Sequence, residues 1–317
     1  MIQFIASLLI ALSPYQGCAV RDGYLWCWSQ DGVTSIDLPH PVTAVAMNAR
    51  STCAVANGAL YCWDGYPQPP SPQPVLPLTK DVRAVALGAA HACAVKRDQL
   101  YCWGHSQYGQ AGAGGDIPIR ILDSKVKALA VGNWHTCALH DQEVVCFGWN
   151  RYGQLGIGKS TISTTQPINV QVPQAPVKAL FAHDDATCAA TGGAVYCWGE
   201  FAHPQYGPTR FFTPTLTFRG QVAALNIDKT GACAITRSGQ LFCYDDAPAR
   251  FRHIPIRERV VGIARSLRSR AALTQSGCVV TWGDNSYQTV NPFESSPRFY
   301  PFPYPLSVFC PESDGKV

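Results

Sequence analysis

The feature that most constrains the fold is a cysteine-containing pattern that recurs seven times along the 317 residues. In each copy a small segment such as Cys53-Ala-Val is followed nine or ten residues later by a segment such as Cys62-Trp63. The first position of the pattern falls at residues 18, 53, 93, 137, 188, 233 and 271, where Ala271 replaces the cysteine in the seventh copy. The spacing runs from 35 residues (18 to 53) to 51 residues (137 to 188), which is typical of a repeat that builds one propeller blade.

The centre of each copy predicts a β-hairpin. In five copies the two cysteines are nine residues apart, so they lie symmetrically about a two-residue centre. Asp22-Gly23, Asn57-Gly58 and Gly192-Gly193 are such centres, and these pairs favour a type I′ turn because both residues take a positive φ. The sixth copy is one residue longer and ends its centre with Gly239, which is typical of a three-residue loop with a bulge.

A strand precedes each hairpin. Eleven residues before the first position, six copies have a valine such as Val42 or Val82, and aliphatic residues alternate after it. Such alternation predicts a half-buried strand. The apolar segment 2–12 aligns with this strand in the first copy, although a secretory signal peptide is the alternative. Because it has no basic residue at its start, we favour the strand, and the export signal would then be missing from this chain.

Several copies resemble regulator-of-chromosome-condensation repeats. The resemblance is carried by Gly88-Ala-Ala-His91, Gly132-Asn-Trp-His135 and Tyr152-Gly-Gln-Leu-Gly156, and it spans about residues 5 to 290. It implies an all-β, seven-bladed β-propeller. We expect a single propeller domain over residues 1–300 and a carboxyl-terminal tail over residues 301–317.

Cysteines that face each other across a hairpin have a Cα separation that suits a disulfide bond. Metal ligation and reduced, buried thiols are the alternatives. Zinc sites use shorter cysteine spacings or nearby histidines, and the paired cysteines are lost together in the seventh copy, so the sequence favours disulfides. Disulfides indicate an oxidising compartment, either extracellular or periplasmic.

Two further cysteines, Cys278 and Cys310, lie outside the repeat pattern. We expect them to bond to each other and to tie the tail to the last blade, although they could also remain unpaired or pair between molecules. The cysteines of the seven expected disulfides are Cys18 and Cys27, Cys53 and Cys62, Cys93 and Cys102, Cys137 and Cys146, Cys188 and Cys197, Cys233 and Cys243, and Cys278 and Cys310.

Motifs that indicate catalysis are missing from the sequence, including the Gly-x-Ser-x-Gly elbow and phosphate-binding loops. We therefore predict no enzymatic activity, no catalytic residue, no cofactor and no metal. His91 and His135 are expected to have a structural role, in which they bond to the turn backbone. The adjacent carboxylates Asp184-Asp185 and Asp245-Asp246 are expected to be solvated turn residues.

Two features are candidates for partner binding. Trp134 occupies a loop position that holds Ala90 in the preceding copy. A group of seven arginines is opposed only by Glu258, and it predicts either a patch for an acidic partner or an ordinary solvated surface. These arginines are Arg250, Arg252, Arg257, Arg259, Arg265, Arg268 and Arg270.

Together these observations predict an exported, monomeric propeller without a membrane span, which binds a protein or a surface polysaccharide through its loops. The resemblance also implies an alternative, a secreted protein inhibitor of a hydrolase similar to the β-lactamase-inhibitor propellers. Nucleotide exchange on a small GTPase and chromatin binding are activities of the family's nuclear members. Paired cysteines argue against these two activities and against a nucleic-acid partner, because disulfides are rare in the nucleus and cytosol.

Overall fold

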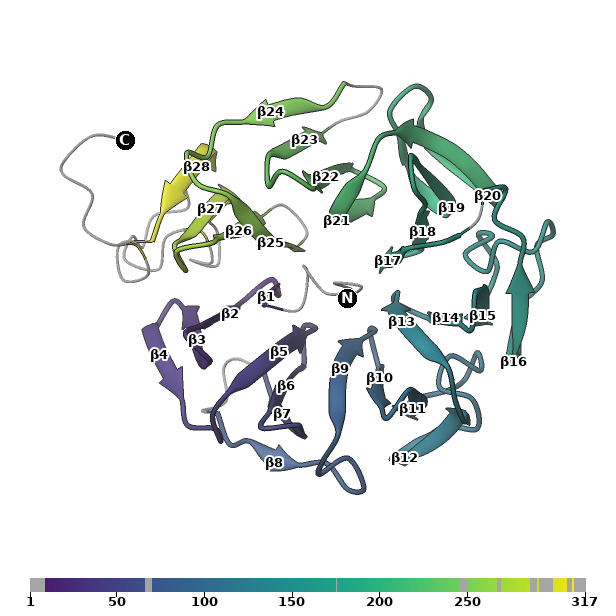
Figure 1. Cartoon of the computed structure of the whole chain (residues 1–317), viewed down its shortest axis with the longest axis horizontal. Coiled ribbons are helices and arrows are strands. Elements are labelled where there is room, and N and C mark those ends of the chain that lie inside the picture. The colour runs from purple at the N-terminus through teal and green to yellow at the C-terminus, as the bar shows by residue number, and fades with distance from the viewer. Residues whose placement is uncertain are drawn as a thin grey trace.

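The chain forms a ring of seven four-stranded antiparallel sheets around a central channel in a computed structural model (Figure 1). The structure describes residues 9–65, 70–174, 176–245, 250–266, 269–285, 290, 299–306 and 310. Within these residues there is no helix, and the seven sheets follow one another in sequence order. The predicted all-β, seven-bladed propeller is therefore confirmed.

The strands divide evenly among the blades. Blade 1 contains β1 (Ile10–Leu12), β2 (Gly17–Arg21), β3 (Tyr24–Ser29) and β4 (Gly32–Ile36), and blade 2 contains β5 (Val42–Met47), β6 (Ser51–Ala56), β7 (Ala59–Asp64) and β8 (Gln73–Pro74). Blade 3 contains β9 (Val82–Leu87), β10 (His91–Lys96), β11 (Gln99–Gly104) and β12 (Gly115–Leu122), and blade 4 contains β13 (Val126–Val131), β14 (His135–His140), β15 (Glu143–Trp149) and β16 (Ser163–Val170). Blade 5 contains β17 (Ala179–His183), β18 (Ala186–Ala190), β19 (Ala194–His203) and β20 (Gly207–Arg219). Blade 6 contains β21 (Val222–Asp228), β22 (Gly231–Thr236), β23 (Leu241–Asp245) and β24 (Arg252–Ile254), and blade 7 contains β25 (Val260–Ser266), β26 (Ser269–Thr274), β27 (Val279–Asp284) and β28 (Phe299–Pro305).

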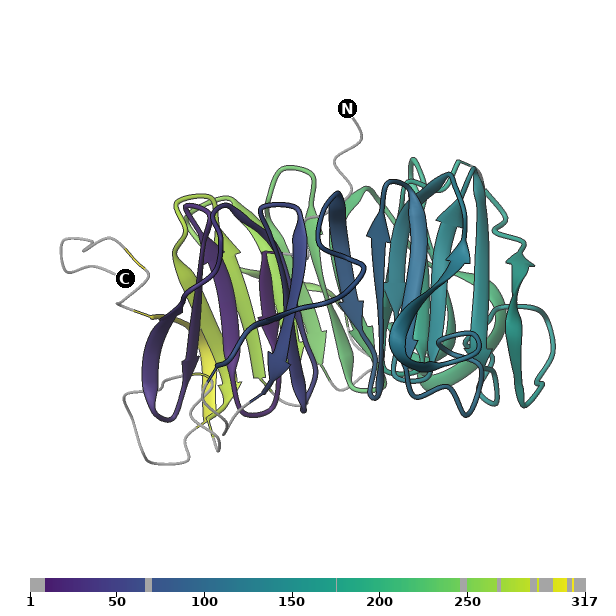
Figure 2. The same ribbon diagram turned by 90° about the horizontal axis from the view of Figure 1, so that it is seen from below.

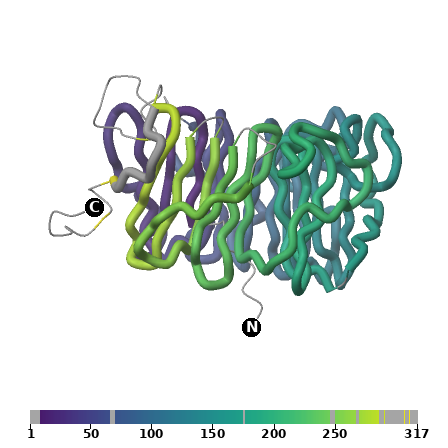
Figure 3. The backbone as a smooth tube through the Cα atoms, turned by 90° about the horizontal axis from the view of Figure 1, so that it is seen from above, coloured from purple at the N-terminus to yellow at the C-terminus, as the bar shows by residue number. Residues whose placement is uncertain are grey.

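The first strand of each blade faces the channel and the fourth lies at the rim (Figure 1). Figures 2 and 3 show from two sides that the strands run along the channel axis. Because neighbouring strands are antiparallel, the turns from first to second strand and the loops from third to fourth strand share one face. We call this the loop face, and we call the opposite face, which carries the turns from second to third strand, the hairpin face.

The hairpin cysteines pair as predicted. In six blades the two cysteines are direct partners across the second and third strands, and their Cα atoms are 4.0 to 4.1 Å apart within a disulfide. The turn residues Asp22 and Asn57 have positive φ, as do the glycines that follow them. The centre Gly192-Gly193 departs from the prediction, since neither glycine has a positive φ and the hairpin there is not of type I′.

The core lies between neighbouring blades. In five blades the third strand carries a tryptophan at one repeat position, and it packs against the preceding blade, as Trp198 of blade 5 does against Leu155 and Val170 of blade 4. At the closure of the ring, Trp28 of blade 1 packs with Leu273 of blade 7. These tryptophans therefore join neighbouring blades.

The first strand of blade 1 confirms the interpretation of residues 10–12. β1 pairs with β2, with Ala11 opposite Cys18, and it contacts β25 of the last blade. Residues 1–8 lie outside the described residues. Among the residues that the structure does describe, no helix is long and apolar enough to cross a membrane.

The seventh blade corrects the predicted domain boundary. β28 pairs with β27, so the boundary expected at residue 300 falls inside a strand and the propeller extends at least to Pro305. The physical reason is that the third strand of a blade needs a fourth strand to pair its open edge. Ala271 and Thr281 are partners in the register that the cysteines occupy elsewhere, and Cys278 and Cys310 form the expected disulfide with a Cα separation of 4.2 Å.

Candidate binding face

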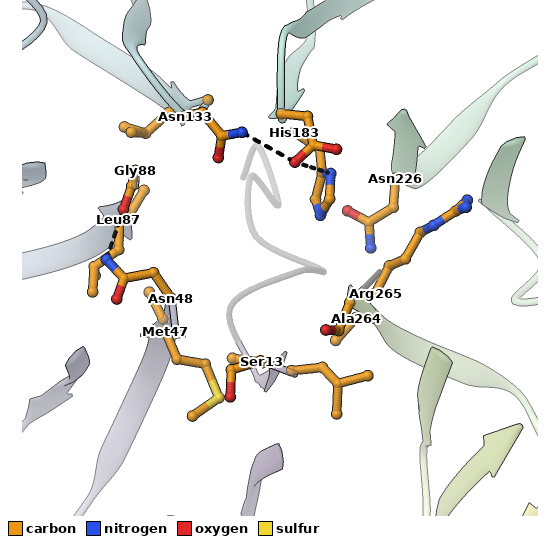
Figure 4. Close-up of a pocket in the computed structure, with 18 of the residues that line it drawn as sticks. Ser13, Met47, Asn48, Leu87, Gly88, Asn133, His183, Asn226, Ala264 and Arg265 are labelled. Carbon is orange, nitrogen blue, oxygen red and sulfur yellow. Dashed lines mark hydrogen bonds and ion pairs between the residues drawn. The ribbon is translucent and has the colours of Figure 1, made fainter. Parts of the chain in front are cut away.

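The loop face has a polar mouth at the channel, with a cavity of about 470 Å³. Figure 4 shows asparagines from three alternate blades at this mouth. Each amide donates to the next blade: Asn48 to the Gly88 carbonyl at 2.7 Å, Asn133 to the Asp184 carboxylate at 3.3 Å, and Asn226 to the Ile263 carbonyl at 3.2 Å. The amides therefore join blades 2 to 3, 4 to 5 and 6 to 7.

Acidic and imidazole side chains gather on one side of the mouth. The ligand atoms of His183, Asp184 and Asp228 lie within 4.8 Å of one another. This donor set does not fit a metal site, because Asp228 already pairs with Arg265 at 2.8 Å and accepts hydrogen bonds from Thr230. The group is better described as an ion-pair network.

Asp185 differs from the solvated turn residue predicted by the sequence. Its pKa is raised to about 6, chiefly by burial and then by the negative charges of Asp184 and Glu200. Lys229 and a hydrogen bond from Gln154 at 3.2 Å oppose this shift. Asp184, Asp185 and Glu200 thus bring three carboxylates together on this part of the loop face.

The predicted arginine group does not form one surface. Arg265 and Arg270 are only 4% and 6% exposed, and they pair with Asp228 and Asp245 between blades 6 and 7. The Arg265 side chain points away from the channel axis (Figure 4). The sequence interpretation did not anticipate this because nearly all residues of β25 and all residues of β26 are buried, so an arginine on these strands needs an internal partner.

The other members of the arginine group are placed differently. Four of them are exposed on or beside the outer strand of blade 6, and one lies outside the described residues. The exposed members are Arg250, Arg252, Arg257 and Arg259, and the member outside the described residues is Arg268. Asp245, which was expected to be solvated, holds Arg270, and Asp246 lies outside the described residues.

His91 and His135 bind hydroxyl groups of the next blade rather than the turn backbone. The Nε2 atom of His91 lies 3.0 Å from Thr136 Oγ1, and that of His135 lies 2.7 Å from Thr187 Oγ1. Burial lowers the pKa of His91 to about 4 and that of His135 to about 3, and the charge of His91 adds to the second shift. Both imidazoles are therefore neutral near pH 7.

Glycines make room for the two imidazole rings. A Cβ atom on Gly88 would lie 2.3 Å from the His91 ring, and one on Gly132 would lie 2.1 Å from the His135 ring. This close approach explains the Gly-x-x-His spacing in blades 3 and 4.

The loops that contain Gly109-Gln110 and Gly153-Gln154 also bind these two threonines. Thr136 Oγ1 donates to the Gln110 carbonyl at 2.9 Å, and Thr187 Oγ1 donates to the Gln154 carbonyl at 3.1 Å. Each threonine hydroxyl therefore accepts from the Nε2–H of a histidine and donates to a loop of the same preceding blade. The histidine and glutamine motifs together bind a threonine of the following blade.

A contiguous row of aromatic side chains crosses blades 3 and 4 on the loop face. It consists of Tyr108, Trp134, Trp149 and Tyr152, all partly exposed, and we call these four residues the aromatic row. Tyr108 stacks on Trp149 with ring centroids 5.4 Å apart and meets Trp134 edge-on at 5.9 Å, while Trp149 meets Tyr152 at 5.1 Å. Trp134 is the only member that the sequence interpretation selected. The Tyr-Gly-Gln motif, which recurs in two successive copies, was a signal for the two tyrosines.

Comparisons with known proteins agree with this architecture. Two models of the regulator of chromosome condensation (RCC1) repeat match residues 82–110 and 126–154, and residues 141–190. Segments of blades 3 to 5 therefore match the RCC1 repeat, within a seven-bladed propeller. No curated protein sequence matches the chain.

Solved structures share the fold at low sequence identity. Human WBSCR16 is 21% identical with a TM-score of 0.74, over 87% of this chain and 84% of that protein. Prp20p from Saccharomyces cerevisiae is 16% identical with a TM-score of 0.57, over 93% of this chain and 76% of that protein. The crinkly ectodomain of the Arabidopsis thaliana receptor kinase ACR4 is 17% identical with a TM-score of 0.57, over 93% of this chain and 98% of that domain.

Proposed function

We propose that this protein is an exported, non-enzymatic propeller that binds a protein partner through its loop face. The observation that carries the proposal is the aromatic row. Tyrosine and tryptophan are enriched in the centres of protein interfaces, because they bury a large area and lose little rotamer entropy on binding. Here four such rings are partly exposed next to one another on loops anchored to a rigid ring of blades.

The disulfides support export. Seven bonds with no free cysteine are typical of proteins that fold in an oxidising compartment and are rare in the cytosol or nucleus.

The comparisons support a protein as the partner. The structure of Prp20p is described together with its binding to Gsp1p and histones, and a further structure contains yeast RCC1 bound to Kap60. These partners are those of Prp20 and are not assigned to this chain. They support only the general point that a propeller of this fold can serve as a protein-binding scaffold.

Site-directed photo-crosslinking tests the proposal. A benzoylphenylalanine at position 149 places a crosslinker in the aromatic row, and one at Tyr24 places it on the hairpin face, where that side chain is 57% exposed. The oxidised protein is incubated in the extracellular medium of its source, irradiated and analysed by mass spectrometry. We expect one dominant adduct at position 149 and none at position 24.

The outcome also identifies the kind of partner. If the crosslinked partner is a hydrolase that loses its activity in the complex, this protein acts as an inhibitor of that hydrolase. Adducts that form equally at both positions, or only at position 24, would contradict binding through the loop face.

A further inference from the structure

Two neighbouring sites on the loop face have the same architecture but different chemistry. In blades 3 and 4 the Tyr-Gly-Gln loops adopt the same conformation: the main-chain N of Tyr108 donates to the Gln110 side chain, and that of Tyr152 to the Gln154 side chain, both at 2.9 Å. The glycines that follow, Gly109 and Gly153, have φ values of 80° and 84°. The two tyrosines therefore occupy equivalent positions.

The residues opposite each tyrosine are also equivalent, because the same backbone hydrogen bond recurs. The N–H of Trp149 donates to the Trp134 carbonyl at 2.8 Å, and that of Glu200 donates to the Asp185 carbonyl at 3.0 Å. Tyr108 thus faces two tryptophans of blade 4, at the positions where blade 5 carries two carboxylates.

The site at Tyr152 already contains a cation. The Arg210 guanidinium lies over the Tyr152 ring, 4.2 Å from its centroid, and Glu200 holds it through an ion pair of 2.7 Å. The chain thus shows that a tyrosine in this loop can bind a guanidinium group on its face.

The equivalent site at Tyr108 lacks an arginine of its own. Glu200 pairs with Arg210 across β19 and β20, and the matching pair across β15 and β16 is Trp149 with Ser163. Ser163 is too short to reach the rings. Among the described residues, no lysine or arginine lies over Tyr108, Trp134 or Trp149.

The rings at this site form a corner, and His105 lies beside it, 6.3 Å from the Trp134 ring between centroids. Trp149 is nearly parallel to Tyr108, at 25°, whereas Trp134 is nearly perpendicular to it, at 85°. Two indole walls at a steep angle can surround a cation on more than one side, and tryptophan gives the strongest cation–π attraction of the aromatic side chains.

The turn that carries Trp134 lies next to a turn that carries two carboxylates. The main-chain N of Asn133 donates to the Asp184 carbonyl at 2.8 Å, so the turn that carries Trp134 is joined to the turn that carries Asp184 and Asp185. The Asp184 side chain is 36% exposed. Charge complementarity at this end of the row therefore favours a positively charged ligand.

We propose that the corner formed by Tyr108, Trp134 and Trp149 binds an arginine side chain of the protein partner. This inference rests on the proposed function and specifies the partner chemistry: a basic segment whose guanidinium binds against these three rings, as Arg210 binds against the Tyr152 ring.

NMR titration of the indole N–H groups tests the proposal with small probes. N-acetyl-arginine amide is compared with N-acetyl-citrulline amide, which has nearly the same shape but no charge. We expect the arginine probe to shift the Trp134 and Trp149 signals saturably and to bind about two- to fivefold more tightly than the citrulline probe, as suits an exposed cation–π contact. The signals of Trp28 and Trp198, which are 1% and 0% exposed, should not move.

Variants keep the test specific. Trp149→Leu should abolish the preference for arginine, whereas Tyr24→Leu on the hairpin face should leave it unchanged. Equal binding of both probes, or no shift of Trp134 and Trp149 with either probe, would overturn the inference. Crosslinking of a partner at position 149 together with equal binding of the two probes would contradict the arginine site alone and leave the proposed function standing.

Discussion

The Nε2 atom of His135 lies 2.7 Å from Oγ1 of Thr187, and these two residues are 52 positions apart on adjacent blades. Thr187 Oγ1 in turn donates to the Gln154 carbonyl at 3.1 Å. The histidine and glutamine motif residues of blade 4 are therefore not a surface site. They form a buried socket for a threonine of blade 5, and His91 and Thr136 repeat the arrangement between blades 3 and 4.

The threonine socket predicts a difference between two identical substitutions. Thr187→Val should lower the free energy of unfolding by roughly 1–3 kcal/mol, because it leaves the buried His135 Nε2–H without an acceptor. Thr52 occupies the same position in blade 2 and is fully buried, and its hydroxyl has no hydrogen-bond partner among the residues that the structure describes. Thr52→Val should therefore be neutral or stabilising. Urea denaturation of the two variants measures the difference, and equal losses would contradict the socket.

The buried histidines predict that the protein loses stability as the pH is lowered. In the unfolded chain each histidine titrates near pH 6.5, whereas in the fold the pKa values of His91 and His135 are about 4 and 3. Between pH 6.5 and about 4 the unfolded state therefore binds protons that the folded state does not, and stability declines as the pH falls through this window. At pH 5 the loss is about 2 kcal/mol for one histidine.

Replacing His135 with Gln isolates this contribution. The pKa of Asp185 is raised to about 6, so this carboxyl group adds stability as the pH falls and partly opposes the histidines. Because both proteins retain Asp185, the difference between wild type and His135→Gln reports on the histidine. The unfolding free energies at pH 7.5 and pH 5.0 should differ less in the variant, and an unchanged pH dependence would rule out a neutral, buried His135.

The two kinds of disulfide should differ in their contribution to stability. Cys278 and Cys310 are separated by 32 residues, compared with nine for Cys53 and Cys62. In the chain-entropy model the longer loop contributes about 3.7 kcal/mol and the shorter one about 2.7 kcal/mol. Calorimetry should therefore find the double variant Cys278→Ser/Cys310→Ser less stable than Cys53→Ser/Cys62→Ser. The reverse order would mean that the closing bond is not the stronger constraint.

The buried arginine of blade 7 should be a structural residue. Arg265→Met leaves the Asp228 carboxylate, 3% exposed, without its cation, and we expect a loss of roughly 3–5 kcal/mol. The double variant Arg265→Met/Asp228→Asn should recover part of this loss, because the unpaired charge is removed. The exposed control Arg252→Met should change the unfolding free energy by less than about 0.5 kcal/mol. Similar losses in Arg265→Met and Arg252→Met would contradict the pairing.

Local patterns predicted the parts of this fold that depend on local geometry. Cys53 and Cys62 are symmetric about Asn57-Gly58, so their spacing alone determines both the hairpin and the bond across it. The outer strands carry no such pattern, and β28 was missed because it follows an irregular, proline-rich segment and depends on pairing with β27.

Features that depend on contacts between blades could not be predicted in the same way. The partner of His135 is 52 residues away, and the partner of Arg265 is 37 residues away, so neither appears in any local window. The aromatic row joins loops of two blades, and only its tyrosines had a repeated signal in the sequence. Trp149 occupies the position of His105 and Glu200 in the neighbouring blades. The sequence alone does not show that this residue contacts the other rings of the aromatic row.

The affinity of the crosslinked partner for a variant of the aromatic row tests the central claim most directly. The partner that is captured at position 149 is purified, and its dissociation constant is measured for wild type, for Trp134→Ala/Trp149→Ala, and for Tyr24→Ala as the control on the hairpin face. Aromatic hot-spot residues contribute 2 kcal/mol or more, so the double variant should bind at least about 30-fold more weakly while the control binds as wild type does. A folded double variant whose affinity falls by less than about twofold would contradict binding through the aromatic row.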